Sequence, residues 1–266
     1  MKKIIDIETQ NNLKKNNTIK RNFFSIIVPC FNGQQYIHRC LNSIISQTYN
    51  RFEVLVIDDG STDSSYLLLK KFSDKDKRIK LIKHKINKGL PSARNSGINK
   101  SIGQYIAFLD IDDWWPKNKL NIYASYFLKG YDILYSDFTR FKSTKNLKLV
   151  RVKKNINSNE LIFSNLIPIS TGAYDKKKLG YRLFEYESPS EDWLFWLNLI
   201  KDSKKSIGIN KNLMFYNVCS NSMSANKIKM AKRAWKIFRE FHKFNIIRSC
   251  YCFTVYFFNG VKRTFL

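Results

Sequence analysis

Four short apolar segments alternate with helical patterns over the first 110 residues, and this alternation constrains the fold more than any other feature. The apolar segments cover residues 23–29, 52–57, 79–82 and 105–109. The stretches between them, with apolar side chains at helical spacing, cover residues 34–47, 62–72 and 91–100. Strands that are apolar on both faces are typical of parallel sheets covered by helices. The sequence therefore predicts an α/β, Rossmann-like fold with a mostly parallel sheet flanked by helices.

The regular alternation ends after residue 109, and the later elements are predicted one by one. We expect helices over 114–129 and 190–200, antiparallel strands over 131–138 and 147–152, an extended piece over 207–216 and a long helix over 226–243. The length of 266 residues suits one large domain or slightly more. The predicted organisation is a basic flexible extension (1–21), a main domain (22–220) and a basic helical C-terminal region (221–266).

The charge of the chain predicts an anionic partner. Lys and Arg number 47 and Asp and Glu 21, which gives a net charge of +26. Such a field suits nucleic acid, an anionic membrane face or a phosphorylated substrate. A nucleic-acid-binding protein would carry a recognisable binding motif, and we find none. We therefore predict no nucleic-acid partner. The hydrophobic content of 44% supplies enough apolar surface for a core and excludes disorder of the whole chain.

Cysteine usage and hydropathy predict a cytoplasmic protein. The five cysteines are an odd number without regular spacing, which is not typical of a disulfide framework or a zinc site. The first 21 residues are polar and lack an apolar run long enough for a signal peptide. No run of 18 apolar residues occurs, so no transmembrane helix is expected.

Carboxylates follow directly after two of the predicted strands. Asp58 and Asp59 follow the second strand, and Asp110, Asp112 and Asp113 follow the fourth. In open parallel sheets, ligands bind at this edge. Acids one residue apart on a tight turn can face one hard divalent ion together with diphosphate oxygens. The alternative is that these acids only cap turns and the next helix.

Four motifs in this order resemble those of family 2 glycosyltransferases, GT-A enzymes that use a nucleotide-activated sugar and invert its anomeric centre. They are Pro-Cys-Phe-Asn (29–32), Val-Ile-Asp-Asp-Gly-Ser-Thr-Asp (56–63), Asn-Lys-Gly-Leu-Pro-Ser-Ala-Arg-Asn-Ser-Gly (87–97) and Phe-Leu-Asp-Ile-Asp-Asp (108–113). The resemblance covers about residues 23–200. It implies that residues 22–220 form a GT-A catalytic domain that uses Mn²⁺ or Mg²⁺.

The resemblance assigns the nucleoside pocket to the first two motifs. Pro29, Phe31 and Asn32 are implied to line it, with Phe31 close to the base. Asp59, or its neighbour Asp58, is implied to accept a hydrogen bond from the base imide. That bond suits uracil, so the expected donor is a UDP-linked sugar.

The acids after the fourth strand are implied to hold the rest of the donor. Asp112 would reach the ribose or the metal, Asp113 would bind the metal, and Asp110 completes the Asp-x-Asp pair. Which two of the three contact the ion stays open. Arg94 is expected to brace the acidic turn or to approach the diphosphate, and a salt bridge that only supports the loop is the alternative.

A second acidic group begins the predicted helix at 190–200. Inversion by direct displacement needs a base that removes the proton of the acceptor hydroxyl. Family members carry a Glu-Asp pair in this region, which implies that Asp192 is the base and that Glu191 orients the acceptor. Trp193 is expected to stack on the acceptor sugar, whereas Trp196 is expected in the core. The alternative for both acids is simple complementation of the helix dipole.

The last third of the chain is basic and amphipathic. Residues 201–266 contain 14 Lys and Arg against 2 acids. On a helical wheel, one face carries Ile228, Ala231, Trp235, Phe238 and Phe241. The opposite face carries Lys229, Lys232, Lys236, Arg239 and Lys243. The helix is expected either to lie on an anionic membrane surface, at the cytoplasmic face of the inner membrane, or to pack on the catalytic domain.

The predicted function is the transfer of a sugar from a UDP-linked donor, with inversion, to a saccharide or lipid-linked saccharide acceptor. Family members of this form imply a role in cell-surface polysaccharide such as lipopolysaccharide or capsule. One alternative is a polyprenyl-phosphate glycosyltransferase, whose anionic acceptor would tolerate Asp192→Asn. Others are a nucleic-acid-binding protein and a family member that has lost activity.

Overall fold

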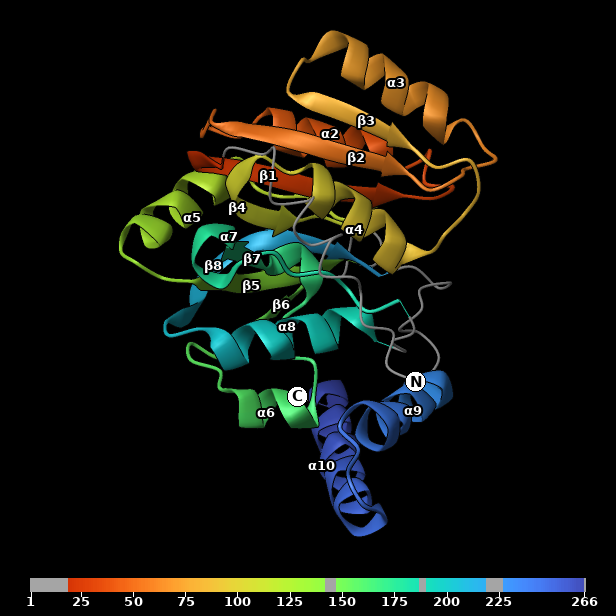
Figure 1. Cartoon of the computed structure of the whole chain (residues 1–266), viewed down its shortest axis with the longest axis vertical. Helices are drawn as coiled ribbons and strands as arrows, with labels where there is room; N and C mark the ends of the chain where they lie inside the picture. Colours follow the sequence, from red (N-terminus) through yellow and green to blue (C-terminus); the bar gives the residue numbers. More distant parts are fainter. Residues whose placement is uncertain (1–18, 142–146, 187–189, 219–226, 266) are drawn as a thin grey trace, which may run out of the picture.

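The computed structural model describes residues 19–141, 147–186, 190–218 and 227–265. Its centre is one eight-stranded sheet in the order β3-β2-β1-β4-β7-β5-β6, with β8 paired to β5 (Figure 1). The strands of the first half are β1 (Lys20–Cys30), β2 (Phe52–Asp58), β3 (Ile79–Lys83) and β4 (Gly103–Phe108). All of them pair parallel, which confirms the predicted parallel sheet.

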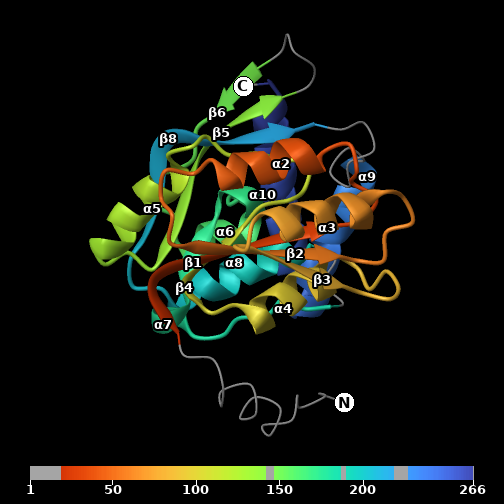
Figure 2. The same ribbon diagram turned by 90° about the horizontal axis from the view of Figure 1, so that it is seen from above.

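The helices between these strands cover both faces of the sheet. They are α2 (Ile37–Ile45), α3 (Ser65–Lys75) and α4 (Leu90–Lys100). The view from above shows α2 and α3 on one side of β1 and β2 and α4 on the other (Figure 2). One core cluster joins α2, α3 and α5 (Lys119–Leu128) to the sheet, and a second joins α4 and the later helices to its other face.

The second half adds strands that run in both directions. These are β5 (Ile133–Phe141), β6 (Leu147–Val150), β7 (Ala173–Asp175) and β8 (Ser206–Asn217). Strand β8 pairs parallel with β5. The predicted antiparallel pairing of β5 with β6 is confirmed. Strand β7 lies antiparallel between β4 and β5 and was not predicted, because three residues are too few to show a strand period.

Three further helices and one 3₁₀ turn support the second half. They are α6 (Ser158–Phe163), η1 (Ile169–Thr171), α7 (Lys176–Leu179) and α8 (Glu191–Asp202). Helix α8 was predicted from its acidic first turn, whereas α6 and α7 are too short to have shown a clear period. The inward face of α8 supplies large aromatic residues to the second core cluster, and this packing fixes where the first turn of α8 lies.

The N-terminal boundary differs from the prediction. The structure describes Lys20 and Arg21 as part of β1, although both were assigned to the flexible extension. Lys20 aligns with Gly103 of β4, and its amide donates to the carbonyl of Ile102 at 2.7 Å. The pairing begins before the apolar run does, because backbone hydrogen bonds at an exposed strand end need no apolar side chain. Residues 1–18 of the predicted extension lie outside the described residues.

The C-terminal region is helical, as predicted. Helix α9 (Lys227–Lys236) continues into a π-helical turn, η2 (Ile237–Phe241), and is followed by α10 (Ile246–Phe265). These helices form the end of the molecule that lies opposite α3 (Figure 1). Within the described ranges, no helix is both long and apolar enough to cross a bilayer.

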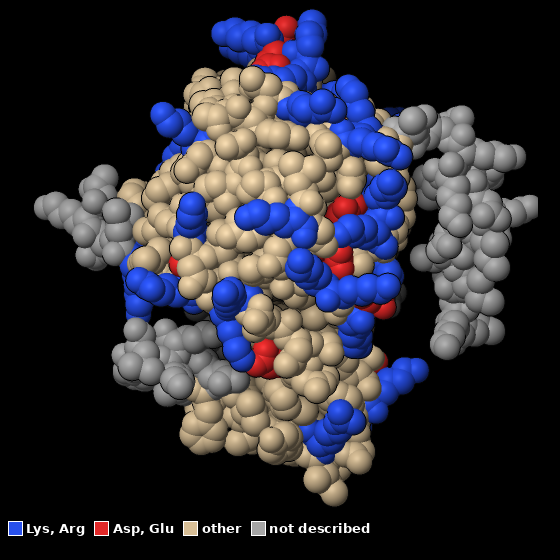
Figure 3. Space-filling model, turned by 90° about the vertical axis from the view of Figure 1, so that its left-hand side faces the viewer, with Lys and Arg blue, Asp and Glu red and all other residues tan. Residues whose placement is uncertain are grey.

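Positive charge is spread over the surface. On the face drawn in Figure 3, Lys and Arg side chains far outnumber Asp and Glu side chains. The net charge of +26 is therefore not confined to the C-terminal helices.

Candidate active site

The two acids at the end of β2 have different environments. Asp59 Oδ1 accepts hydrogen bonds from His84 Nδ1 at 2.6 Å and from the Lys88 amide at 3.0 Å, and Oδ2 accepts from the Gly89 amide at 2.8 Å. Asp58 is fully buried, and neither of its oxygens has a hydrogen-bond partner among the described residues. Asp59 therefore organises the loop that leads into α4, while Asp58 is a buried acceptor without a donor, which is costly.

The loops after β1 and β2 are tied together beside these acids. Asn32 has a φ of +48° and lies between the loops. Its amide donates to Ser61 Oγ at 3.0 Å, and its Oδ1 accepts from the Thr62 amide at 2.8 Å. Pro29 is buried within β1, and the Phe31 side chain is 48% exposed at the carboxyl edge of the sheet. The arrangement leaves an open aromatic ring where a planar base can stack.

The turn after β4 is held in place by several elements. The Asp113 amide donates to the Asp110 carbonyl at 3.0 Å, which closes the turn. The Asp110 amide donates to Ser170 Oγ at 3.0 Å, and Asp113 Oδ1 accepts from the Asn217 amide at 3.0 Å. Arg39 donates to the Asp112 carbonyl at 2.9 Å. These bonds fix the backbone of three neighbouring acids, which we call the strand-end acids (Asp110, Asp112, Asp113).

The strand-end acids are close enough to disturb one another. Burial, and next the charge of Asp110, raise the pKa of Asp112 to about 6. Burial, followed by the charges of Asp112 and Asp110, raises the pKa of Asp113 well above its usual value. Repulsion of this kind is relieved by a hard cation, and carboxylate oxygens are the ligands that Mg²⁺ and Mn²⁺ prefer. Among the described residues, no group of three His, Cys, Asp or Glu side chains forms a complete metal site.

Arg94 joins the strand-end acids to the second acidic group. It lies on α4 with 1% exposure. Its Nη2 donates to Asp110 Oδ1 at 2.8 Å and its Nη1 donates to Glu191 Oε1 at 2.9 Å. Glu191 and Asp192 form the first turn of α8, and we call them the helix-start acids. The structure therefore brings together two acidic groups that are far apart in the sequence.

Asp192 has the environment of a base. Its Oδ2 accepts from Asn165 Nδ2 at 2.7 Å, and its Oδ1 accepts from the Trp193 amide at 2.9 Å. Burial, and next the charge of Glu191, raise its pKa to about 6, while Arg94 acts in the opposite direction. A carboxylate with a pKa of about 6 is ionised at neutral pH and is a stronger base than an ordinary aspartate.

The structure corrects the assignment of Trp193. Its side chain is 3% exposed, its Nε1 donates to the Leu161 carbonyl, and its ring packs against Phe238 and Tyr256. No ring face is left for an acceptor sugar. The correction has a simple cause, since Trp193 lies on the side of α8 that faces the C-terminal helices. Trp196 is fully buried, as expected.

Several residues of the site were not predicted. Asn165, which contacts Asp192, and Ser170, which contacts the Asp110 amide, lie on the segment between α6 and β7. Arg39 lies on α2, and His84 follows β3. Each is a single polar residue whose partner is distant in the sequence. The chain therefore offers no local pattern that would have identified them.

Comparison with known families and proteins agrees with this geometry. A model of glycosyl transferase family 2 matches residues 25–183, more than half of the chain. The E. coli protein named UDP-Glc:alpha-D-GlcNAc-diphosphoundecaprenol beta-1,3-glucosyltransferase WfgD is 32% identical over 90% of this chain and 94% of its own. A Bacillus subtilis protein named as a teichuronic acid biosynthesis glycosyltransferase, TuaG, is 28% identical over 90% of this chain and 96% of its own.

Solved structures share the fold. S. aureus TarS (residues 1–349) in complex with UDP-GlcNAc superposes with a TM-score of 0.68 at 21% identity, covering 88% of this chain and 71% of that one. The mannosyltransferase PcManGT from Pyrobaculum calidifontis, in complex with GDP-Man and Mn²⁺, superposes with a TM-score of 0.63 at 16% identity, covering 90% and 71%. At these identities the likeness establishes the architecture, which is that of the GT-A glycosyltransferases.

Proposed function

The chain belongs to glycosyltransferase family 2, and on that premise we propose that it transfers a sugar from a UDP-linked donor, with inversion, to a lipid-linked saccharide used in cell-surface polysaccharide. The transfer of a glycosyl group follows from the family itself. The donor, the stereochemistry and the acceptor are the proposal.

The observation that carries the proposal is the bridge through Arg94. One buried guanidinium lies 2.8 Å from Asp110 and 2.9 Å from Glu191. A donor held by the strand-end acids is therefore next to Asp192, which follows Glu191 in the chain. Displacement in one step needs this proximity, because the acceptor hydroxyl must lose its proton while its oxygen attacks the anomeric carbon.

The donor assignment rests on the nucleoside end of the site. Phe31 offers an exposed ring for the base. Asp59 Oδ2 accepts one hydrogen bond, from the Gly89 amide, and has capacity for a second. The imide N–H of uracil is a donor of the right kind. The names of WfgD and of the TarS complex both include a UDP-sugar, which supports the same choice.

The strand-end acids fit a divalent ion. Asp112 and Asp113 would hold Mn²⁺ or Mg²⁺ together with oxygens of the donor diphosphate. Burial first and neighbouring carboxylates second raise their pKa values, and a cation would offset both effects. When bound, the ion neutralises negative charge on the departing diphosphate. The Mn²⁺ in the name of the PcManGT complex supports this proposal.

Asp192 acts on the acceptor. It takes the proton of the acceptor hydroxyl, the hydroxyl oxygen forms the new bond to the anomeric carbon, and the bond from that carbon to UDP breaks. Attack from the side opposite UDP converts an α-linked donor into a β-glycoside. Asn165 and the Trp193 amide hold the carboxylate of Asp192 in one orientation during this step.

The experiment is a transfer assay with Asp192→Asn. Purified protein is given UDP-glucose or UDP-N-acetylglucosamine, Mn²⁺ and a saccharide linked to a polyprenyl diphosphate. We expect the variant to lower kcat by about 100- to 10,000-fold, the range of a general base, and to keep its thermal shift with UDP. Asp202→Asn, at the exposed end of the same helix, is the matched control and keeps full activity.

The assay also separates this proposal from its alternatives. A variant that keeps full activity with a polyprenyl-phosphate acceptor would favour the polyprenyl-phosphate glycosyltransferase. A thermal shift with GDP but not with UDP, under the same Mn²⁺ concentration, would overturn the donor assignment.

A further inference from the structure

Helix α9 is attached to the catalytic domain through part of its apolar face. Ala234 of α9 is buried, as are Ile237 and Phe238 of the η2 turn that continues it, and Phe238 packs edge-on against Trp193 of α8. This contact realises the packing alternative predicted from the sequence. It leaves Ile228 of α9 71% exposed, while Ala231 and Trp235 are half-buried.

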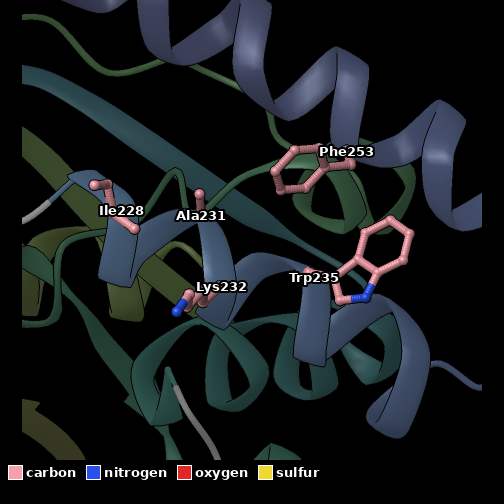
Figure 4. Close-up of a pocket in the computed structure, with 5 residues that line it drawn as sticks. All are labelled: Ile228, Ala231, Lys232, Trp235 and Phe253. Atoms are coloured by element: carbon pink, nitrogen blue, oxygen red, sulfur yellow. The ribbon is translucent and has the colours of Figure 1, made fainter.

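A shallow apolar groove separates α9 from α10. It has a volume of about 350 Å³. Its lining consists of Ile228, Ala231, Lys232, Trp235 and Phe253 (Figure 4). The rings of Trp235 and Phe253 meet edge-on, with centroids 5.7 Å apart. The groove is thus a junction where half-buried apolar side chains of the two helices meet.

Helix α10 carries apolar side chains on its outer face as well as its inner one. Ser249 and Cys252 are buried on the inner side. On the outer side, Ile247, Tyr251 and Phe258 lie at helical spacing and are 78%, 63% and 64% exposed. Ile246 and Phe257, on the same side as Phe253, are also exposed. An uncovered apolar area of this kind on a protein surface marks an interaction site.

The apolar area is bordered by lysines. Lys229, Lys232 and Lys236 are exposed on α9. The sequence-based expectation put them opposite Ile228 and Trp235, but the buried side of the helix runs through Ala234, so the lysines lie beside Ile228 and Trp235 on the exposed side. Lys236 also forms an exposed ion pair with Glu240 at 3.5 Å. Glu240 is the one acid in the sequence between residues 227 and 265, which contains ten Lys and Arg. Apolar side chains beside a row of lysines are typical of helices that lie at a membrane surface, where acyl chains meet anionic headgroups.

We propose that these residues form a docking surface for an anionic lipid bilayer. The α9–α10 surface consists of Ile228, Trp235, Ile247, Tyr251 and Phe258 with Lys229, Lys232 and Lys236. The apolar side chains enter the interface and the lysines contact lipid phosphates. The charge argues against a second copy of the chain as the occupant, because two such basic surfaces repel each other. The helices lie on the bilayer and do not span it.

The test is co-sedimentation of the full chain with vesicles. We expect binding to vesicles of phosphatidylglycerol and phosphatidylethanolamine, weak binding to phosphatidylcholine, and loss of binding as salt rises. Ile247→Glu combined with Phe258→Glu abolishes binding, and Lys229→Gln with Lys232→Gln and Lys236→Gln weakens it on the order of 100-fold at low salt. All five side chains are exposed, so the variants keep the core.

Matched controls lie at the other end of the molecule. Leu67→Glu on α3 changes a side chain that is 61% exposed, and Lys71→Gln with Lys75→Gln and Lys100→Gln removes three exposed charges from α3 and α4. Both controls keep vesicle binding. Absence of binding to anionic vesicles, or equal loss in the controls, overturns the proposal. So does a dimer, seen by light scattering without lipid, that Ile247→Glu with Phe258→Glu converts to a monomer.

The result does not depend on the proposed chemistry. Binding is measured without donor or acceptor. Transfer to a short soluble acceptor reports the catalytic site separately.

Discussion

The strand-end acids and the helix-start acids are both groups of carboxylates that are at least half-buried, but they are held in different ways. The strand-end acids are three side chains in one turn, which is held by hydrogen bonds to Arg39 of α2, Ser170 of η1 and Asn217 of β8. The helix-start acids are two adjacent side chains, of which Asp192 is held by one amide side chain and one backbone N–H. The first arrangement concentrates negative charge in one turn. In the second, the neighbours of one carboxylate, Asp192, set its pKa.

The difference matches the two tasks that the proposed function assigns to these groups. Holding a cation needs several oxygens at fixed positions. Repulsion between their charges increases the stabilisation that the protein gains when a cation binds. Accepting a proton needs one carboxylate whose pKa lies closer to neutrality. Arg94 is common to both groups, and it keeps them adjacent without neutralising Asp192, which Asn165 contacts instead.

The largest expected effect comes from removing the residue that the two groups share. Arg94→Met leaves Asp110 and Glu191 facing each other without a cation, so we expect the free energy of unfolding to fall by about 3 kcal/mol. Transfer activity falls by at least about 100-fold, because the first turn of α8 loses its anchor to the donor side. Urea denaturation and the transfer assay measure the two effects.

The control for Arg94 is Arg182, which pairs with Asp202 at 2.6 Å on the surface. Arg182→Met changes the free energy of unfolding by less than about 1 kcal/mol, as exposed pairs do, and leaves activity intact. If both variants lose equal stability and activity, the two acidic groups are not coupled through Arg94.

The parallel half of the sheet was predictable because its signals are local. The first, second and fourth strands come from mainly apolar segments of five or more residues, and acids directly follow the second and the fourth. Burial on both faces leaves this pattern in any window of the sequence. The same locality explains why the strand-end acids were found, since a carboxylate after an apolar strand is conspicuous by itself.

The rest of the site depends on tertiary contacts that no window contains. Asn165 contacts Asp192 across 27 positions, and Asn217 contacts Asp113 across 104. The placement of Trp193 was wrong for the same reason. A tryptophan beside two acids can stack on a sugar or pack in the core. Trp193 packs in the core because Phe238 and Tyr256, from helices near the end of the chain, lie against its ring.

The next effect concerns the strand-end acids and pH. The pKa of Asp112 is about 6, above the ordinary 3.8, so its contribution to stability is present below about pH 4 and is lost as the pH rises through 6. A cation bound at the strand-end acids would restore the stability that is lost when Asp112 ionises. We therefore expect Mn²⁺ to raise the melting temperature more at pH 7.5 than at pH 5.0, because protons compete for the same oxygens at low pH.

Differential scanning fluorimetry with and without Mn²⁺ measures this difference, and two acid-to-amide variants interpret it. Asp112→Asn removes the response to Mn²⁺ at both pH values. Asp74→Asn, which changes an exposed carboxylate on α3, retains the response of the unchanged chain. A response to Mn²⁺ that is equal at the two pH values would place the ion elsewhere.

The smallest effect tests the helix-start acids. Because the pKa of Asp192 is about 6, kcat/KM rises about tenfold per pH unit below 6 and becomes constant above it. This rise is the acid limb of the pH profile. Asn165→Ala removes a hydrogen bond to the ionised carboxylate of Asp192, so the pKa of Asp192 rises and the acid limb moves to higher pH by about one pH unit. Asn157→Ala is the control, since Asn157 caps α6 nearby. It costs about 1 kcal/mol of stability and leaves the limb in place. A limb that moves equally in both variants would mean that Asn165 acts through general stability, and a limb that moves in neither would mean that Asp192 is not the group that titrates.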